Sequence, residues 1–180
     1  MALVLALRER AQAMFRSFPY VLLLAASAYA QAGALGPVAN DPMFGKYPAE
    51  IRFHGTPARP LHNTPNSRSF RTVIREDESA GPNFADHYTV AVWGCGSDCV
   101  AFSIVDAITG KVFDFPWGSV SWNDEKDGGV GYRRDSRVIH VIGSLNEGGN
   151  SADRWYLWDG TKLKLISKNA VQHLDRSNPN

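Results

Sequence analysis

Residues 87–115, HYTVAVWGCGSDCVAFSIVDAITGKVFDF, decide the fold. Three runs within this stretch, 87–93, 100–106 and 111–115, are rich in Val, Ile, Phe, Tyr and Trp, and turn-forming residues separate them. Such residues, alternating with a period of two, are typical of β-strands. The stretch therefore predicts an antiparallel meander of hairpins.

The same pattern continues toward the C-terminus. Runs 130–134 and 137–143 predict a third hairpin, and runs 154–158 and 161–167 predict a fourth. Asp159-Gly160 lies between the last two runs, and an Asp-Gly pair favours a two-residue turn. Two segments rich in Gly, Asn, Asp and Ser, 118–129 and 145–153, are predicted to be long loops, which often carry function.

One amphipathic helix is predicted ahead of the meander, between Pro65 and Ala80. Phe70, Val73 and Ile74 fall at helical spacing within it. Thr64 or Ser67 could cap its start, and Gly81-Pro82 stops it. Upstream, residues 50–54 alternate like a short strand, and the proline-containing segment 55–63 is predicted to be a loop. The fold class is α+β, mostly β: one helix, then a meander that forms a small sheet, sandwich or barrel.

Residues 1–32 resemble a secretory signal peptide. Arg8, Arg10 and Arg16 precede the apolar run 20–26, and two overlapping A-x-A cleavage sites follow. The apolar part is nearer to about ten residues than to the roughly twenty of a membrane span, so no stable span is expected after cleavage. Translation could start at Met1 or at Met14. We expect a periplasmic or secreted protein with a loose segment 33–48, one β-rich domain 49–168 and a flexible tail 169–180.

The charge balance excludes a partner that needs a strong basic field. The chain has 19 Lys plus Arg and 18 Asp plus Glu, a formal net charge of +1. Residues 1–32 hold three Arg and one Glu, so the remainder has 16 basic and 17 acidic residues. Nucleic-acid binding driven by charge is therefore not expected.

The two cysteines are the sharpest chemical feature. A disulfide needs Cα atoms about 4.4–6.8 Å apart, whereas four residues of extended strand span about 13 Å. If Cys95 and Cys99 are bonded, the chain must fold back between them, and Gly94 and Gly96 permit the positive φ of such a turn. A local structural disulfide is favoured. The alternatives are a redox-active dithiol and a zinc site completed by a histidine (His54, His62 or His87).

Three segments resemble a motif string of an uncharacterised family of small exported bacterial proteins: NFADHY (83–88), WGCGSDC (93–99) and DAITGKV (106–112). The resemblance covers about residues 66–116 and, more loosely, 156–160. Members commonly have Gly where this chain has Asp86. The candidate functional residues are Asn83, His87, Trp93, Asp98 and Asp106.

Isolated polar and aromatic residues have plainer interpretations as well. His87 beside Asp86 could be a general base, but a hydrogen-bonded residue at a strand end is favoured. The tryptophans could mark a glycan or peptide surface, although such residues are more often core. Because Trp155 and Trp158 point to opposite sheet faces, at least one is exposed, covered by another segment or part of a binding face.

Two functional hypotheses from different classes follow. The first is a non-enzymatic periplasmic or envelope binding module that presents its disulfide-shaped loop and long polar loops to an envelope protein or glycan. The second is a small hydrolase or metal-dependent enzyme built on Asn83, His87, Asp98 and the cysteine loop. The sequence predicts no cofactor and no metal ligand set. Convergence of those side chains in one concave pocket would favour the enzyme.

The leader gives the first testable prediction. Protein recovered from a periplasmic extract should have an intact mass that lacks residues 1 to about 32, because signal peptidase cleaves after A-x-A. A mass that retains Tyr20 would contradict export by this route.

Overall fold

A computed structural model describes residues 41–122, 128–146 and 148–171, all within one compact unit. The predicted signal peptide lies outside the described residues, as do 33–40 of the predicted loose segment and 172–180 of the predicted tail. None of the helices in the described ranges has the length and apolar character needed to cross a membrane.

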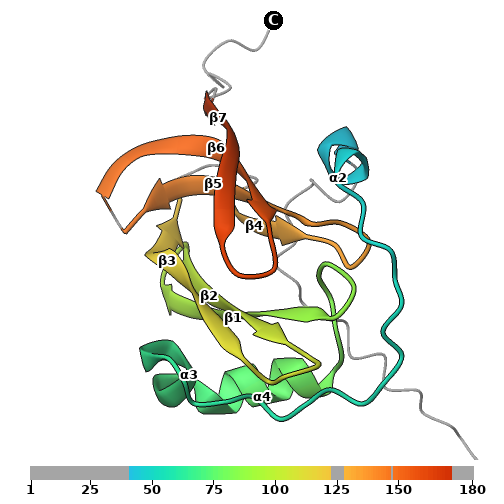
Figure 1. Cartoon of the computed structure of the whole chain (residues 1–180). Coiled ribbons are helices and arrows are strands. Elements are labelled where there is room, and N and C mark those ends of the chain that lie inside the picture. Colours follow the sequence, from blue (N-terminus) through green and yellow to red (C-terminus); the bar gives the residue numbers. More distant parts are fainter. Residues whose placement is uncertain (1–40, 123–127, 147, 172–180) are drawn as a thin grey trace, which may run out of the picture. The chain divides into compact units, whose positions relative to one another are not determined.

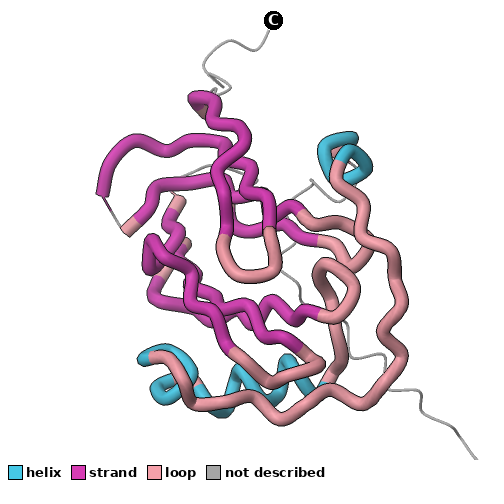
Figure 2. Tube along the Cα trace, in the orientation of Figure 1, coloured by secondary structure: helices cyan, strands magenta, loops and turns pink. Residues whose placement is uncertain are grey.

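Seven antiparallel strands form one curled sheet, which confirms the predicted mostly-β antiparallel architecture (Figures 1 and 2). The strand order is β1-β2-β3-β5-β6-β7, and β4 pairs with β5 on the side where the end of β3 also pairs. The strands are β1 (Tyr88–Gly96), β2 (Cys99–Asp106), β3 (Val112–Ser121), β4 (Gly129–Tyr132), β5 (Val138–Leu145), β6 (Gly148–Trp158) and β7 (Leu163–Ala170).

The main core lies on the inner face of this sheet. Alternate side chains of β1 to β6 meet there and exclude water, the dominant favourable contribution to folding. The largest buried members are Phe84, Phe102, Ile104, Phe115, Ile139, Tyr156 and Trp158.

Helices cover the outer face. Helix α4 (Arg71–Ser79) packs Ile74 against β1, β2 and β3, and Phe70 stacks on Trp93 with ring centroids 4.4 Å apart. Helix α2 (Pro42–Lys46) packs Phe44 edge-on against Trp155 at 5.0 Å. Trp155 and Trp158 therefore point to opposite faces and are both buried, because α2 covers the outer one.

The prediction of a single helix over residues 65–80 is wrong. Helix α3 (Pro65–Ser69) is separate from α4, and the chain bends at Phe70, whose φ and ψ are −108° and 26°. This bend places the Phe70 ring over Trp93. Thr64 caps α3 in a capping box with Ser67, so both predicted capping residues take part. Helix α2 also lies within the segment predicted to be loose.

Residues 50–54 are extended but do not form the predicted strand. The N–H groups of Arg52 and Phe53 donate to Asp86 Oδ1 at 2.7 and 2.8 Å, so a side chain takes the place of a neighbouring strand. The segment continues to Asn63, and we call residues 50–63 the strap. Its Ala58 and Leu61 N–H groups donate to carbonyls of the β2–β3 turn. Pro48 forms one isolated bridge, to Ser136.

The predicted loop limits also need correction. Strand β3 continues to Ser121 and β6 begins at Gly148, so parts of both predicted long loops pair as strands. The β6–β7 connection has four residues instead of two, because Trp158 pairs with Leu163. Asn169 and Ala170 belong to β7 and not to a flexible tail.

Side chains cover the outer edge of β1, which has β2 on its other side. The Asn83 side chain accepts from the Val90 N–H at 2.8 Å and donates to the Val90 carbonyl at 3.2 Å. Asp77 of α4 accepts from the Val92 N–H at 3.1 Å. Covering an edge in this way prevents unwanted strand pairing.

Glu78 of α4 carries a buried carboxyl on the helix face that packs against the sheet, with 2% of its surface exposed. Neither of its oxygens has a well-formed hydrogen bond within the described structure. Burial raises the pKa of Glu78 to about 7; the Thr89 hydroxyl opposes this only in part, and the charge of Asp106 adds to it.

Glu78→Gln should therefore stabilise the protein above neutral pH. Between about pH 4.5 and 7 the native state holds a proton that the unfolded state has released, so the stability of the wild type falls as pH rises through this window. We expect urea unfolding at pH 8 to show the variant about 2–3 kcal/mol more stable than wild type, with little difference below pH 4.5.

Glu76→Gln is the matched control, because Glu76 lies on the same helix but is exposed. A gain in stability at pH 8 that is equal for both variants would contradict a specific cost of burying Glu78.

Candidate functional site

Two hairpins and a strand end meet at one end of the sheet, where the β1–β2 hairpin, the end of β3 and the β5–β6 hairpin lie side by side (Figure 1). We call residues 94–98, 119–122, 146 and 148–150 the tip cluster. These residues come from the cysteine loop and from the two segments that the sequence predicted as polar loops. The structure therefore brings together three regions that are far apart in the chain.

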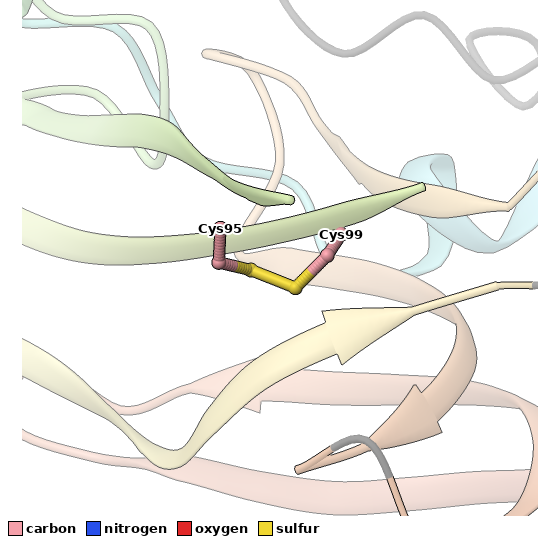
Figure 3. Close-up of a disulfide and its surroundings, with 2 residues drawn as sticks. All are labelled: Cys95 and Cys99. Carbon is pink, nitrogen blue, oxygen red and sulfur yellow. A yellow bond between two sulfur atoms is a disulfide. The ribbon is translucent and has the colours of Figure 1, made fainter. Parts of the chain in front are cut away.

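The β1–β2 hairpin turns at Ser97 and Asp98, because Gly96 pairs with Cys99. The Cys95–Cys99 disulfide closes the turn with a Cα–Cα distance of 5.2 Å, which confirms the predicted fold-back (Figure 3). Cys95 is the extra residue of a β-bulge instead of standing directly opposite Cys99. Of the two glycines that the sequence offered for a positive φ, Gly96 has one and Gly94 does not. Asp98 has a positive φ as well.

Backbone hydrogen bonds connect the end of β3 to each of the two hairpins. The Trp122 N–H donates to the Asp98 carbonyl at 2.9 Å, and the Asn146 N–H donates to the Ser119 carbonyl at 3.1 Å. Gly118, at φ +72°, lies against Asn146: a Cβ at this position would be 2.4 Å from Asn146 Oδ1. The tip cluster is therefore one connected surface.

The hairpin tip within this cluster is exposed and polar. All of residues 94–98 are exposed, whereas Cys99 is buried. The large exposed hydrophobic side chains among the described residues all lie elsewhere, at Ile51, Leu61, Phe70, Ile108 and Leu165. The tip thus offers backbone groups and small polar side chains to a ligand.

His87 lies at the opposite end of β1, in an open pocket of about 300 Å³ that also includes Asp86, Tyr88, Arg137 and Asp159. Its Nδ1 is 3.0 Å from Asp86 Oδ2, and its Nε2 is 3.9 Å from Asp106 Oδ1. The imidazole therefore lies between two carboxylates, as expected of a hydrogen-bonded histidine at a strand end.

Both carboxylates beside His87 also hold the backbone. Partial burial raises the pKa of Asp86, but the N–H groups of Phe53 and Arg52 and the contact with His87 outweigh it, so this pKa lies below its usual value. Asp86 has φ +74°, a backbone conformation that favours glycine. Asp106 accepts from the Ile108 N–H at 2.8 Å and from the Thr109 hydroxyl at 2.8 Å, so it shapes the β2–β3 turn.

The five candidate residues do not form one site. His87 and Asp106 lie close together, but the Asn83 amide is bonded to Val90 and Trp93 is buried beneath α4. Asp98 is at the far end of β1. Strand residues rise about 3.3 Å each, so the nine residues of β1 separate the His87 pocket from the disulfide by about 26 Å.

The disulfide also bears on the alternative of a zinc site. A zinc site would need free thiolates, and here both sulfurs are bonded to each other. In the described parts of the chain, no group of three or more His, Cys, Asp or Glu side chains is arranged to hold a metal ion.

Sequence reasoning missed a second histidine–carboxylate pair. His140 Nε2 is 2.6 Å from Asp153 Oδ1, and the ring stacks on Trp155 at 4.0 Å. His140 is buried, and its Nδ1 has no partner among the described residues. The available signal was a histidine at the centre of the apolar strand sequence VIHVI, where a buried imidazole needs a polar partner.

No family model, curated protein or solved structure matches the chain.

Removal of the disulfide should loosen the tip and leave the fold intact. By the chain-entropy relation, closing a five-residue loop contributes about 2 kcal/mol. We expect Cys95→Ser/Cys99→Ala to lower the free energy of unfolding in urea by about that amount, with faster amide exchange confined to the tip cluster.

Ser97→Ala, which changes the tip but keeps the bond, is the control and should leave both readouts near wild type. Global unfolding of the double variant, or the loss of stoichiometric zinc that the wild type carried, would contradict a local structural disulfide.

Proposed function

We propose that the chain is an exported, non-enzymatic binding module, periplasmic or secreted, that presents the tip cluster to a protein of the cell envelope. The observation that carries this proposal is the meeting of two hairpins and the end of β3 at one end of the sheet, one of the hairpins being closed by a disulfide. Loops held by a rigid scaffold are the usual location of binding residues.

The tip is held in one shape although it is exposed. Residues 94–98 make little contact with the core, yet the disulfide, the Gly96–Cys99 pairing and the Trp122–Asp98 hydrogen bond each constrain them. A loop ordered before binding loses less conformational entropy when a partner docks. A disulfide that spans only five residues adds little to global stability, so we assign it the role of keeping this shape.

The chemistry of the tip favours a protein partner over a glycan. The exposed backbone amides and carbonyls of a glycine-rich turn can form hydrogen bonds with another main chain or with polar side chains. Sugar rings are commonly held on flat aromatic faces. Trp122, the aromatic residue of the tip cluster, is partly buried and lies against Gly128, and the large exposed hydrophobic side chains of the described chain lie elsewhere. We therefore place a polar, hydrogen-bonded protein interface here.

Export is supported by two independent features. A disulfide forms and persists in oxidising compartments and is rare in the cytosol. The leader pattern in residues 1–32 gives a route to such a compartment. The resemblance to a family of small exported bacterial proteins agrees with both.

Site-specific photo-crosslinking in living cells tests the proposal. A benzoylphenylalanine at Ser97 should give a discrete, protease-sensitive adduct. The same group at Lys162, exposed in the β6–β7 connection at the end of β6 remote from the tip cluster, is the matched control and should not give that adduct. Because the disulfide shapes the tip, the Ser97 adduct should weaken several-fold when Cys95 and Cys99 are replaced.

Identical adducts from Ser97 and Lys162, or no tip adduct from a folded and exported protein, would overturn the proposed role of the tip. An adduct that resists protease but disappears after digestion of the cell-wall glycan would replace the protein partner with a glycan.

A further inference from the structure

A pocket of about 290 Å³ lies between the strap and α4 and shares no residue with the tip cluster or with the His87 pocket. It is lined by Arg59, Pro60 and His62 of the strap and by Arg71, Thr72 and Arg75 of the helix. Figure 1 shows the strap running along α4. Three arginines and a histidine thus share one concavity with no acidic residue in its lining.

The strap is fixed in place by the β2–β3 turn. The Ala58 N–H donates to the Ala107 carbonyl and the Leu61 N–H to the Gly110 carbonyl, both at 2.7 Å. Gly110, at φ +73°, allows direct contact: a Cβ there would lie 2.2 Å from the Arg59 carbonyl oxygen. The backbone on either side of Arg59 is therefore held, and Arg59 is placed opposite the helix.

Helix α4 separates its charges between two faces. Arg71 and Arg75 are four residues apart and share the face toward the strap, where like charges at this spacing repel. Asp77 instead binds the edge of β1, and Glu78 is buried against the sheet. Glu76 is exposed but does not line the pocket. The acidic residues of the helix therefore leave the pocket face positive.

The positive charges of the pocket are not balanced within the described chain. Over residues 41–122, 128–146 and 148–171, no carboxylate lies within 4 Å of the guanidinium groups of Arg59, Arg71 or Arg75. His62 Nδ1 is 3.0 Å from the Ser67 carbonyl, so this nitrogen donates and Nε2 is left to accept from a hydroxyl of a ligand. A concavity of unpaired cations calls for an anion.

We propose that this basic pocket binds a small phosphate monoester. Guanidinium groups present paired N–H donors that match the oxygens of a phosphate, and several of them together suit its double negative charge. The Thr72 hydroxyl can supply a further donor. The volume exceeds what one phosphate group occupies, which leaves room for a compact polar alcohol attached to it.

This proposal goes beyond the proposed function, because the basic pocket shares no residue with the tip cluster. A variant can therefore lose phosphate binding and keep the Ser97 adduct, or the reverse, so the two proposals fail separately.

Titration calorimetry of the full chain with glycerol 3-phosphate, and separately with inorganic phosphate, tests the proposal. We expect Arg71→Gln/Arg75→Gln to weaken glycerol 3-phosphate binding at least about tenfold, since each lost charged hydrogen bond is typically worth that much. Lys162→Gln/Lys168→Gln removes the same charge from the exposed β6–β7 hairpin and should bind like wild type. Added salt should weaken binding to the wild type.

Folding is checked independently. Arg71 and Arg75 are exposed and like-charged, so their replacement should leave the unfolding temperature unchanged or slightly higher. Vesicles of phosphatidylcholine with phosphatidic acid distinguish a free phosphate ester from a lipid headgroup.

Absence of glycerol 3-phosphate binding by the wild type would overturn the proposal. So would a loss of affinity in the lysine control equal to that in the arginine variant. Binding confined to the vesicles would overturn the free ester as ligand.

Discussion

Both faces of the curled sheet are buried, and this constraint determines what else the chain must supply. A sheet that buries only one face can leave the other to water, but here β1, β2, β5 and β6 carry large apolar side chains on both faces. Helices α4 and α2 are needed as covers, and each adds one buried ring or branched side chain at its centre. Glu78 and His140 are buried as a consequence, because they lie on the covered outer side.

Asp and Asn side chains complete the backbone pairing where the sheet ends. Buried N–H and C=O groups must find partners, and the ends of strands and the edges of sheets have none of their own. The Asp86 carboxylate accepts from backbone N–H groups of the strap. Asp77 and Asn83 accept from N–H groups on the edge of β1, and Asp106 accepts from an N–H group in the β2–β3 turn. An acidic residue near a motif is therefore often already bound to backbone, which weakens any argument that assigns it a catalytic role from sequence alone.

The sequence predicted the strands well because their alternation is local, and it failed where a distant group decides the structure. Residues 50–54 look like a strand, but their partner is the Asp86 carboxylate more than thirty residues away. The bend at Phe70 brings its ring onto Trp93, a contact that no pattern within the helix reveals. Among the candidate functional residues, the wide separation of His87 from the cysteines follows from the predicted strand between them. Pairing of His140 with Asp153 instead requires the β5–β6 register, which changes with a single residue in the turn.

Net charge excludes less than it first suggests. A chain with 19 basic and 18 acidic residues has no overall field to attract a long polyanion. The fold nevertheless assigns acidic residues to backbone contacts and to the His87 pocket, and gathers arginines between the strap and α4. Local charge is set by where the fold places each side chain: among the described residues no carboxylate lies within 4 Å of Arg59, Arg71 or Arg75. A pocket of about 290 Å³ is of the size of a small molecule, so near-neutrality of the chain and a small-anion site are compatible in one molecule.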